Sequence, residues 1–284
     1  MSLQISSLNS GSNGNCYYIS NHDEAVLVDG GISCRETERR MKRLGLSMKK
    51  VKAIFVSHEH TDHIYGVSSL SKKYQLPVYI TTDTLRNGNL NGKLNLNQDL
   101  TYSFRAHEPV AIGNLSVTAF PKYHDARDPH SFIVSGEGIT IGVFTDIGIP
   151  CQHVRRNFEQ CHAAFLESNY YEMMLEHGGY PYHLKNRIRG DNGHLSNTQA
   201  VQLFQKHRPP FMSHLFLSHL SQHNNSPEIV ARMFTKVAGH TEIIIASRHE
   251  ETAVYTIDLP LGFMGSSVER VRVPVQRVSQ LSLF

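Results

Sequence analysis

The sequence HEHTDH, residues 58–63, places three imidazoles and an aspartate within six residues. It follows the apolar run VKAIFVS, residues 51–57, which is typical of a buried strand. On an extended backbone, side chains two residues apart point to the same side. His58 and His60 should therefore lie together, while Glu59 points away from them and is assigned no chemistry.

This concentration of metal-capable side chains at a strand end favours a metal site over the alternative, an unliganded polar loop. One metal ion can take His58 and His60, and a second can take Asp62 and His63, which come after the chain turns. Each ion needs about four or more ligands, so the rest of the chain must supply the remainder. The spacing differs from that of the helical metalloproteases, and the cysteines of a zinc finger do not accompany it.

The composition is that of a globular protein, because 40% of the 284 residues are hydrophobic and 19% are charged. No apolar run approaches the roughly 20 residues of a membrane helix, and the first residues lack the pattern of a secretory signal. We therefore expect a soluble cytoplasmic protein without a membrane partner, with its four cysteines reduced. The formal net charge of +3 does not by itself indicate nucleic-acid binding.

Short apolar runs alternate with amphipathic segments along the chain, and this alternation predicts strands mixed with outer helices. The predicted strands are residues 3–8, 16–20, 24–31, 51–57, 77–81, 100–106, 115–121, 131–136, 139–146, 163–168, 214–219 and 242–247. The predicted helices are residues 33–44, 63–74, 196–206 and 227–237. The pattern forms two similar halves, which indicates two sheets between helices.

The pattern His-x-His-x-Asp-His resembles the signature of the metallo-β-lactamase superfamily and matches it in full. The resemblance implies an α/β fold, the four-layered αββα sandwich of the metallo-β-lactamase type, over residues 1–260. It also implies two divalent metal ions per chain, zinc or manganese, with iron as a further option.

The same resemblance supplies the remaining ligands, each at the end of an apolar run. One metal would be held by His58, His60 and His124, the other by Asp62, His63 and His219, and Asp146 would bridge both. Asp29, in LVDGG, matches a family aspartate that braces the site without binding metal.

A metal pair of this kind activates a water molecule, so the resemblance implies hydrolysis. Diiron relatives that reduce oxygen have a Glu where this chain has His60, so redox chemistry is not expected. The best-known β-lactamases have a Cys where this chain has Asp146. The ligand set alone leaves thioester, lactam, lactone and phosphodiester bonds open.

The segment GHLSNTQAVQLF, residues 193–204, resembles the Gly-His-Ser-Thr segment of transfer-RNA 3′ processing enzymes. By that resemblance His194 protonates the departing oxygen, which the alkoxide leaving group of a phosphodiester requires. Ser196 or Asn197 would cap the following helix. His194 and Asp62 are thus the candidate catalytic residues, and a capping-loop histidine without catalysis is the alternative for His194.

A series of motifs spread over most of the chain resembles the WalJ/YycJ-type subfamily, cytoplasmic bacterial hydrolases linked to nuclease action on DNA. The motifs are SGSNGNCYYI, VSHEHTDHI, HDARDP, TDIG, LESNYYEMML, YPYHLKNRI, GHLSN and HLSQHNN. The resemblance implies a metal-dependent phosphodiester hydrolase, a DNA exonuclease acting in DNA repair or replication. The alternatives are a phosphodiesterase of small molecules or cyclic nucleotides, and a non-catalytic regulatory module bound to the bacterial sliding clamp.

Two further sets of residues have both a functional and a structural interpretation. The segment SGSNGN, residues 10–15, can offer N–H groups to a phosphate or simply form a hairpin turn. Four polar residues can contact a nucleic-acid backbone or only stabilise the Tyr-Pro turn. They are Asn169, Tyr180, Lys185 and Arg187.

Residues 261–284 are predicted to be a C-terminal extension that ends in QLSLF. Leaving Leu281, Leu283 and Phe284 in water is unfavourable, so this segment should either dock as a final strand on the chain's own sheet or bind a partner. The pentapeptide resembles the Gln-Leu-x-Leu-Phe motif that binds the bacterial sliding clamp, in which Gln280 would hydrogen-bond at a pocket rim.

Overall fold

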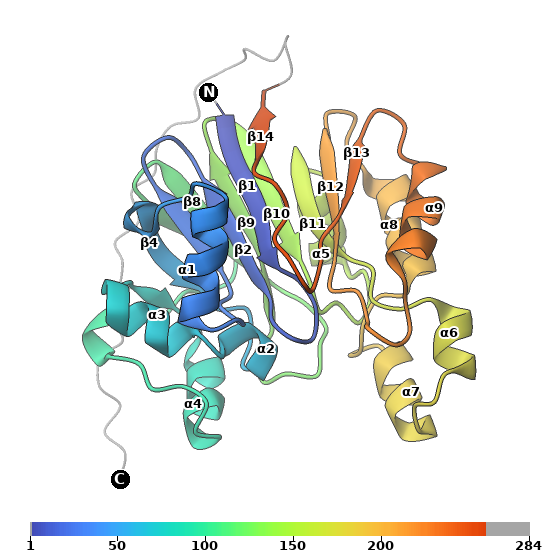
Figure 1. Ribbon diagram of the computed structural model, residues 1–284, viewed down its shortest axis with the longest axis horizontal. Coiled ribbons are helices and arrows are strands. Elements are labelled where there is room, and N and C mark those ends of the chain that lie inside the picture. Colours follow the sequence, from blue (N-terminus) through green and yellow to red (C-terminus); the bar gives the residue numbers. More distant parts are fainter. Residues whose placement is uncertain (1, 260–284) are drawn as a thin grey trace.

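The computed structural model describes residues 2–259, which form two sheets between layers of helices (Figure 1). The first sheet has the order β14-β1-β2-β3-β4-β5-β6. Its strands are β1 (Ser2–Asn9), β2 (Cys16–Ser20), β3 (Ala25–Val28), β4 (Val51–Phe55), β5 (Val78–Tyr79), β6 (Thr101–Tyr102) and β14 (Tyr255–Asp258). The second sheet has the order β13-β12-β11-β10-β9-β8-β7. Its strands are β7 (Pro109–Ile112), β8 (Leu115–Pro121), β9 (His130–Gly136), β10 (Ile139–Phe144), β11 (Ala163–Glu167), β12 (His214–Ser218) and β13 (Glu242–Ile245).

Helices cover the outer face of each sheet. The helices on the first sheet are α1 (Cys34–Arg43) and α3 (Val67–Tyr74), and those on the second are α5 (Gln152–Phe158), α8 (Asn197–His207) and α9 (Pro227–Thr235). Near the lower end of the sheets in Figure 1 lie α2 (Thr61–Ile64), α4 (Thr82–Leu90), α6 (Glu172–His177) and α7 (Tyr182–Arg189). Two 3-10 turns are η1 (Met48–Lys50) and η2 (Gln98–Leu100).

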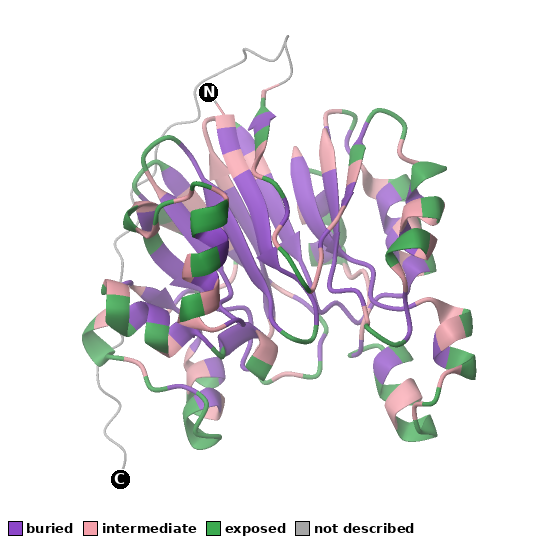
Figure 2. Ribbon diagram, in the orientation of Figure 1, coloured by how far each residue is buried: buried purple, intermediate pink, exposed green. Residues whose placement is uncertain are grey.

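Buried apolar side chains fill the space between all the layers. Between the sheets, Phe55 of β4 meets Phe132 of β9 edge to face, with ring centroids 5.8 Å apart. Tyr17 of β2 and Phe165 of β11 have centroids 4.8 Å apart. Alternate side chains of the same strands pack outward against the helices, whose solvent-facing sides are exposed (Figure 2). The predicted αββα sandwich is therefore confirmed.

Two helices begin at caps that the sequence predicts. Ser33 accepts the backbone N–H of Glu36 at 3.2 Å at the start of α1. Ser196 forms a capping box with Gln199 at the start of α8. Of the two candidate caps for α8, Ser196 is therefore the one used, and Asn197 is the first residue of the helix.

The prediction of one helix over residues 63–74 is wrong, because Gly66 separates α2 from α3. The Gly66 N–H donates to the carbonyl of Gly30 at 2.7 Å. A Cβ on Gly66 would lie 2.0 Å from the carbonyl oxygen of Ile32, so only glycine permits this approach. The contact with the loop after β3 interrupts the helix and holds the HEHTDH segment against that loop.

Parallel strands in both sheets end at the same edge of the sandwich. Strands β3 and β4 are parallel, as are β10, β11 and β12. Strand β8 is antiparallel to β9, which is antiparallel to β10, so β8 and β10 run in the same direction. Side chains that follow these strands can therefore meet at the lower end in Figure 1, beside α2.

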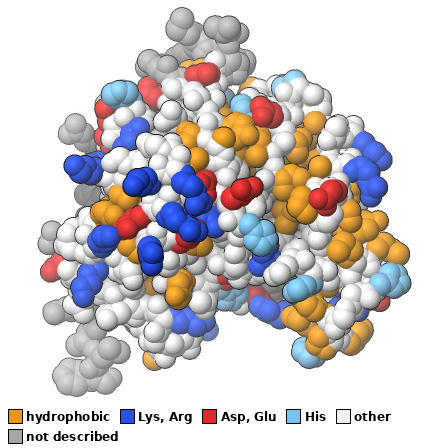
Figure 3. Space-filling view, in the orientation of Figure 1, with side chains coloured by type: hydrophobic (Ala, Val, Ile, Leu, Met, Phe, Trp, Pro, Cys, Tyr) orange, Lys and Arg blue, Asp and Glu red, His pale blue; other side chains and the backbone are white. Residues whose placement is uncertain are grey.

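Helix α1 carries five basic residues, Arg35, Arg39, Arg40, Lys42 and Arg43, and Figure 3 shows Lys and Arg side chains grouped over this region. Arg39 and Arg40 pair with Glu36, and Arg43 pairs with Glu251. Much of this positive charge is therefore balanced by neighbouring carboxylates.

The four cysteines are free thiols, of which Cys16 and Cys161 are buried. None of the helices described within residues 2–259 combines the length and the hydropathy that a membrane span requires. The predicted extension, residues 261–284, with Gln280, Leu281, Leu283 and Phe284, lies outside the described residues.

Candidate metal centre

The ligands predicted for the first metal, His58, His60 and His124, lie together and are called the first ligand group. His58 Nε2 is 3.1 Å from His60 Nδ1, and His124 Nε2 is 3.3 Å from the same atom. The extended backbone after β4 puts His58 and His60 on one side. Glu59 points away, as predicted, and accepts a hydrogen bond from the Asn87 amide at 2.6 Å.

The ligands predicted for the second metal, Asp62, His63 and His219, also meet and are called the second ligand group. Asp62 Oδ2 is 3.4 Å from His219 Nε2 and 3.6 Å from His63 Nε2. Helix α2 begins directly after His60, so Asp62 and His63 leave the extended path of the preceding residues. His219 follows β12 in the other sheet.

Asp146, which follows β10, reaches both ligand groups. Its Oδ2 lies 3.0 Å from His63 Nε2, and its Oδ1 lies 3.6 Å from His124 Nε2. The residue is 2% exposed, and Oδ2 makes no well-directed hydrogen bond to any described residue, although it lies within ion-pair distance of His63. A buried carboxylate oxygen in this state is costly unless a cation balances it. The residues present therefore fit a divalent metal ion, both by donor type and by charge.

Asp29 and Ser57 hold the histidines that follow β4. His63 Nδ1 lies 2.7 Å from Asp29 Oδ2, and Ser57 Oγ donates to the same oxygen at 2.9 Å. His58 Nδ1 lies 2.9 Å from Ser57 Oγ. Because the ring nitrogens facing Asp29 and Ser57 carry protons, the opposite nitrogens are the ones that would donate lone pairs to a metal ion. Asp29 thus lies where the sequence predicted a brace.

Glu167, the last residue of β11, has the corresponding place in the second sheet, and the sequence did not single it out. Its Oε1 lies 2.8 Å from His194 Nδ1 and 2.9 Å from His219 Nδ1. Its Oε2 accepts the backbone N–H groups of Ile147 and Leu195 at 2.8 and 3.0 Å. One fully buried carboxylate therefore fixes two histidines. The available signal was an acid at the end of an apolar run, which does not by itself identify its partners.

His194 lies beside both ligand groups. Its ring centroid is 5.1 Å from that of His124 and 5.3 Å from that of His219. Its side chain is 17% exposed, whereas that of His124 is fully buried. The backbone N–H of His194 donates to the carbonyl of Ile188 in α7 at 2.9 Å. His194, the predicted acid, therefore lies at the rim of the centre, where solvent can reach it.

The carboxylates around the centre determine the proton affinity of its other groups. Burial disfavours a charged His63, but Asp146, Asp29 and Asp62 outweigh burial and raise the pKa of His63 to about 10. Burial likewise disfavours an ionised Glu167, yet the neighbouring histidines lower the pKa of Glu167 to about 2. A cation in the second ligand group would replace the proton that the carboxylates otherwise hold on His63.

Three residues of the centre have left-handed backbone conformations. The φ angle is 60° at Asp29, 53° at Asp146 and 56° at His219. A non-glycine residue held at such an angle costs about 1–3 kcal/mol. Hydrogen bonds from the surrounding structure impose the conformation, among them the bond from the His219 N–H to Ser10 Oγ at 2.7 Å.

The loop SGSNGN, between β1 and β2, packs directly against the centre. The side-chain amide of Asn15 lies 3.1 Å from His63 Nε2 and 3.3 Å from Asp62 Oδ2. The loop therefore lines the site in addition to making the hairpin turn. Asn15 is a second site residue that the sequence did not single out by number.

The four residues considered for nucleic-acid contact have different environments. Asn169 is buried and donates to the carbonyl of His219 at 2.8 Å, so it positions His219, a predicted metal ligand. Lys185 donates to the carbonyl of Glu176, and Tyr180 packs against the apolar side of α7. The side chain of Arg187 is 55% exposed.

A family model described as the Beta-lactamase superfamily domain matches residues 24–219, a range that contains both ligand groups. The chain belongs to the β-lactamase superfamily. Within it, the chain is 34% identical to exodeoxyribonuclease YycJ of Bacillus anthracis, over 82% of this chain and 88% of that protein. It is 28% identical to exodeoxyribonuclease WalJ of Streptococcus pneumoniae, over 80% of this chain and 85% of that protein. The predicted resemblance to the WalJ/YycJ-type subfamily is confirmed.

Solved structures of the β-lactamase superfamily type share the fold. The metallo-β-lactamase fold protein YhfI of Bacillus subtilis aligns with a TM-score of 0.68 and 17% identity, over 90% of this chain and 100% of that one. Zinc-bound PqqB of Methylobacterium extorquens aligns with a TM-score of 0.70 and 13% identity, over the same shares of each chain. Family membership and the ligand groups together make the chain a metal-dependent hydrolase.

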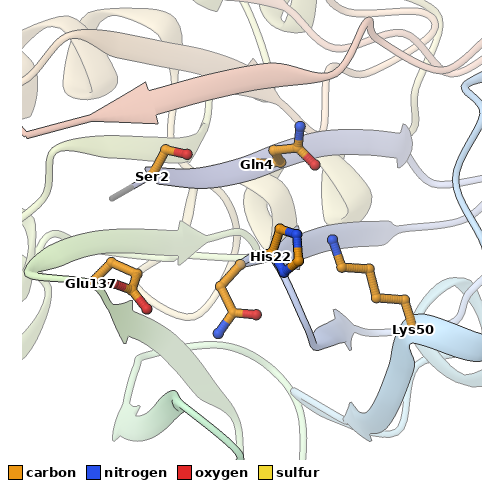
Figure 4. Close-up of a pocket in the computed structure, with 6 residues that line it drawn as sticks. Ser2, Gln4, His22, Lys50 and Glu137 are labelled. Carbon is orange, nitrogen blue, oxygen red and sulfur yellow. The ribbon is translucent and has the colours of Figure 1, made fainter.

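A cavity of about 360 Å³ lies apart from the candidate metal centre. Figure 4 shows residues that line it. It is found near the start of β1, whereas the metal-capable residues lie at the other end of the sheets. Its lining residues are Ser2, Gln4, Asn21, His22, Lys50 and Glu137. These residues belong to none of the metal-capable groups found within residues 2–259.

Proposed function

We propose that this protein is a phosphodiester hydrolase that acts on DNA as an exonuclease, in cytoplasmic DNA repair or replication. The observation that carries the proposal is the pair formed by Glu167 and His194, 2.8 Å apart beside the ligand groups. A departing alkoxide needs a proton, so a braced histidine at the rim has a defined task in cleaving a phosphodiester. The relatives YycJ and WalJ, which are named exodeoxyribonucleases, support the same reaction.

Two divalent ions, zinc or manganese with iron as a further option, are proposed for the two ligand groups. His58, His60 and His124 would hold one ion, Asp62, His63 and His219 the other, and Asp146 would be shared. The bound ions would supply an activated water and positive charge near the attacked phosphate. A donor set of imidazoles and carboxylates without thiolates suits all three metals.

His194 is the proposed general acid. Because its Nδ1 faces Glu167, its Nε2 is the nitrogen that can give a proton to the departing oxygen. Glu167 stabilises the charged imidazole that must form before that transfer. The carboxyl can do so because its pKa of about 2 keeps it ionised at neutral pH. Glu167 thus acts through His194 without contacting the substrate.

Asp62 is proposed to act twice, as a ligand and as the acceptor that orients the attacking water. Its side chain is 20% exposed, compared with 2% for that of Asp146. Its Oδ2 faces the second ligand group, and its Oδ1 has no hydrogen bond within residues 2–259. The second oxygen is therefore available to a water molecule on the solvent side.

The test is incubation of the purified protein with end-labelled duplex and single-stranded DNA, in zinc or manganese, beside the variant His194→Ala. We expect wild type to shorten the DNA from an end. The variant should lose about 100-fold or more in turnover, the usual contribution of a general acid, while elemental analysis finds its metal content unchanged. Unchanged turnover would exclude the acid role, and no cleavage by wild type with any metal would exclude the nuclease.

A tether to the bacterial sliding clamp is the second part of the proposal. It rests on the sequence QLSLF, in which Gln280, Leu281, Leu283 and Phe284 match the clamp-binding pattern. Tethering would raise the effective concentration of the enzyme at DNA, which suits a chain whose net charge is only +3. Deletion of residues 280–284 should abolish clamp binding in calorimetry. Unchanged affinity, or no binding by the intact chain, would remove this part.

A further inference from the structure

Arg187 lies on α7 next to the metal centre, with most of its guanidinium unused. We propose that Arg187 binds the phosphate adjacent to the scissile one, so that the site selects a polynucleotide over a compound with a single phosphodiester. The inference rests on the proposed function and names its substrate class more closely. It assigns α7 the task of holding the strand while the bond beside it is cleaved.

A short series of contacts places Arg187 relative to the ligands. Asp125 Oδ1 lies 3.4 Å from His124 Nε2, a nitrogen of the first ligand group. The other oxygen, Oδ2, accepts a hydrogen bond from Arg187 Nε. The carboxylate of Asp125 therefore links the guanidinium to the first ligand group. Because Asp125 lies between Arg187 and the first ligand group, we assign the guanidinium to the neighbouring phosphate of the same strand and not to the bond under attack.

The guanidinium has donors available for an anion. Its Nε is committed to Asp125, but Nη1 and Nη2 make no hydrogen bond to any residue from 2 to 259. The side chain is 55% exposed. Arg presents its remaining N–H groups in a planar fork that matches a phosphate, and charge-assisted bonds of this kind are roughly twice as strong as neutral ones. Asp125 orients the fork without occupying the terminal nitrogens.

The backbone fixes Arg187 relative to the proposed acid. Its neighbour Ile188 is buried and accepts the backbone N–H of His194 at 2.9 Å. A Cβ on Gly193 would lie 2.1 Å from the carbonyl oxygen of Ile188, so the loop and the helix are in close contact. A strand held by Arg187 is therefore held in register with His194.

Arg189, two residues further along α7, is a matched control because its side chain is committed elsewhere. Its Nη1 donates to Glu176 Oε2 at 3.0 Å, and its Nε donates to Asn186 Oδ1 at 3.1 Å. The guanidinium also lies 5.7 Å from the ring centroid of Tyr182. Arg189 thus lacks the two features of Arg187, the uncommitted terminal nitrogens and the link through Asp125 to the first ligand group.

The experiment compares Arg187→Gln, Arg187→Lys and Arg189→Gln on two substrates, with metal content and Tm measured for each protein. The substrates are a DNA oligonucleotide and bis-p-nitrophenyl phosphate, which has a single phosphodiester. For Arg187→Gln we expect KM on the oligonucleotide to rise about 10- to 100-fold, the range for a lost charge-assisted hydrogen bond. The slope of log(kcat/KM) against log[salt] should also become shallower by about 1.

The controls define what would overturn the inference. Hydrolysis of bis-p-nitrophenyl phosphate should be unchanged in Arg187→Gln, Arg187→Lys should recover part of the loss, and Arg189→Gln should match wild type on both substrates. The inference fails if Arg187→Gln matches wild type on DNA. It also fails if both substrates are affected equally, because Arg187 would then act on the scissile phosphate or only support the loop. A wild-type protein that cleaves no DNA would instead refute the proposed function, and this inference with it.

Discussion

In the half of the centre that follows β4, one short segment, residues 57–63, supplies all the predicted ligands. The half from the second sheet instead draws its residues from four separate strand ends, at His124, Asp146, Glu167 and His219. Each half has a buried carboxylate that orients imidazoles. Asp29 serves the first half through His63 and Ser57, and Glu167 serves the second through His194 and His219.

The two carboxylates differ in what depends on them. The histidines near Asp29, His58 and His63, are both predicted ligands. Glu167 is shared between a predicted ligand, His219, and a histidine outside the ligand groups, His194. Under the proposed function, the first half holds metal only. The second half would couple metal binding to proton donation through a single side chain, and the variants below separate these two tasks.

The largest effect is expected where the halves join. Asp146→Ala removes the carboxylate that reaches both ligand groups, at 3.0 Å from His63 and 3.6 Å from His124. Loss of an outer partner of a ligand already costs about 10- to 100-fold, so loss of a shared ligand should reduce turnover by more than about 100-fold. Elemental analysis should find less metal bound. Full metal content and full turnover in this variant would contradict the shared role.

Substituting Asp29 and Glu167 one at a time separates the effects of the two buried carboxylates. Asp29→Asn should weaken metal affinity by about 10- to 100-fold, and excess metal should restore turnover, because the brace serves only ligands. Glu167→Gln should weaken affinity similarly, but excess metal should leave turnover low because His194 has lost its charged partner. Metal titrations followed by activity provide the measurement. Complete rescue of Glu167→Gln by metal would show that Glu167 does not support proton donation.

The same contrast explains what could be predicted from the sequence. The half formed by residues 57–63 could be predicted, because a spacing of two residues after an apolar run places His58 and His60 together. Most strands and the helices α1, α3, α8 and α9 were also predicted, since their apolar periodicity is strong. Glu167 was not, because a single acid after an apolar strand has no local pattern, and its partners lie 27 and 52 residues away in sequence.

Elements with weak periodicity were missed for a related reason. β7 and β14 are edge strands of four residues each, and the missed helices α4, α5, α6 and α7 have only six to nine residues each. The break between α2 and α3 depends on Gly66 touching a distant loop, which the helical pattern of residues 63–74 does not reveal. At this break a tertiary contact outweighed local preference.

A smaller effect, on the free energy of unfolding, tests how closely the loop after β3 packs against the segment that carries Asp62. A Cβ on Gly31 would lie 1.7 Å from the carbonyl oxygen of Asp62, so Gly31→Ala must displace α2. We expect a loss of about 1–3 kcal/mol in the free energy of unfolding, typical of overpacking. The control is Gly179→Ala, where no atom lies within 4 Å of the added carbon. Urea denaturation measures both, and equal stability would contradict a tight contact.

The smallest effect concerns pH and the second half. In metal-free protein the histidines outweigh burial and lower the pKa of Glu167 from 4.5 to about 2. A carboxyl with a lowered pKa contributes stability above pH 4.5, and this contribution is lost as the pH falls towards 2. Wild type should therefore exceed Glu167→Gln in Tm by on the order of 2–4 °C at pH 6. The difference in Tm should close as the pH falls to about 2, and a constant difference would contradict the assignment.

The left-handed angles at Asp29, Asp146 and His219 have a consequence for engineering and for natural variation. Glycine would relax the main chain at each of these positions while deleting a group the centre requires. A selection for thermal resistance that accepts glycine at any of these sites would therefore keep an inactive variant. Screens that aim for a hardier enzyme should therefore score turnover alongside survival on heating.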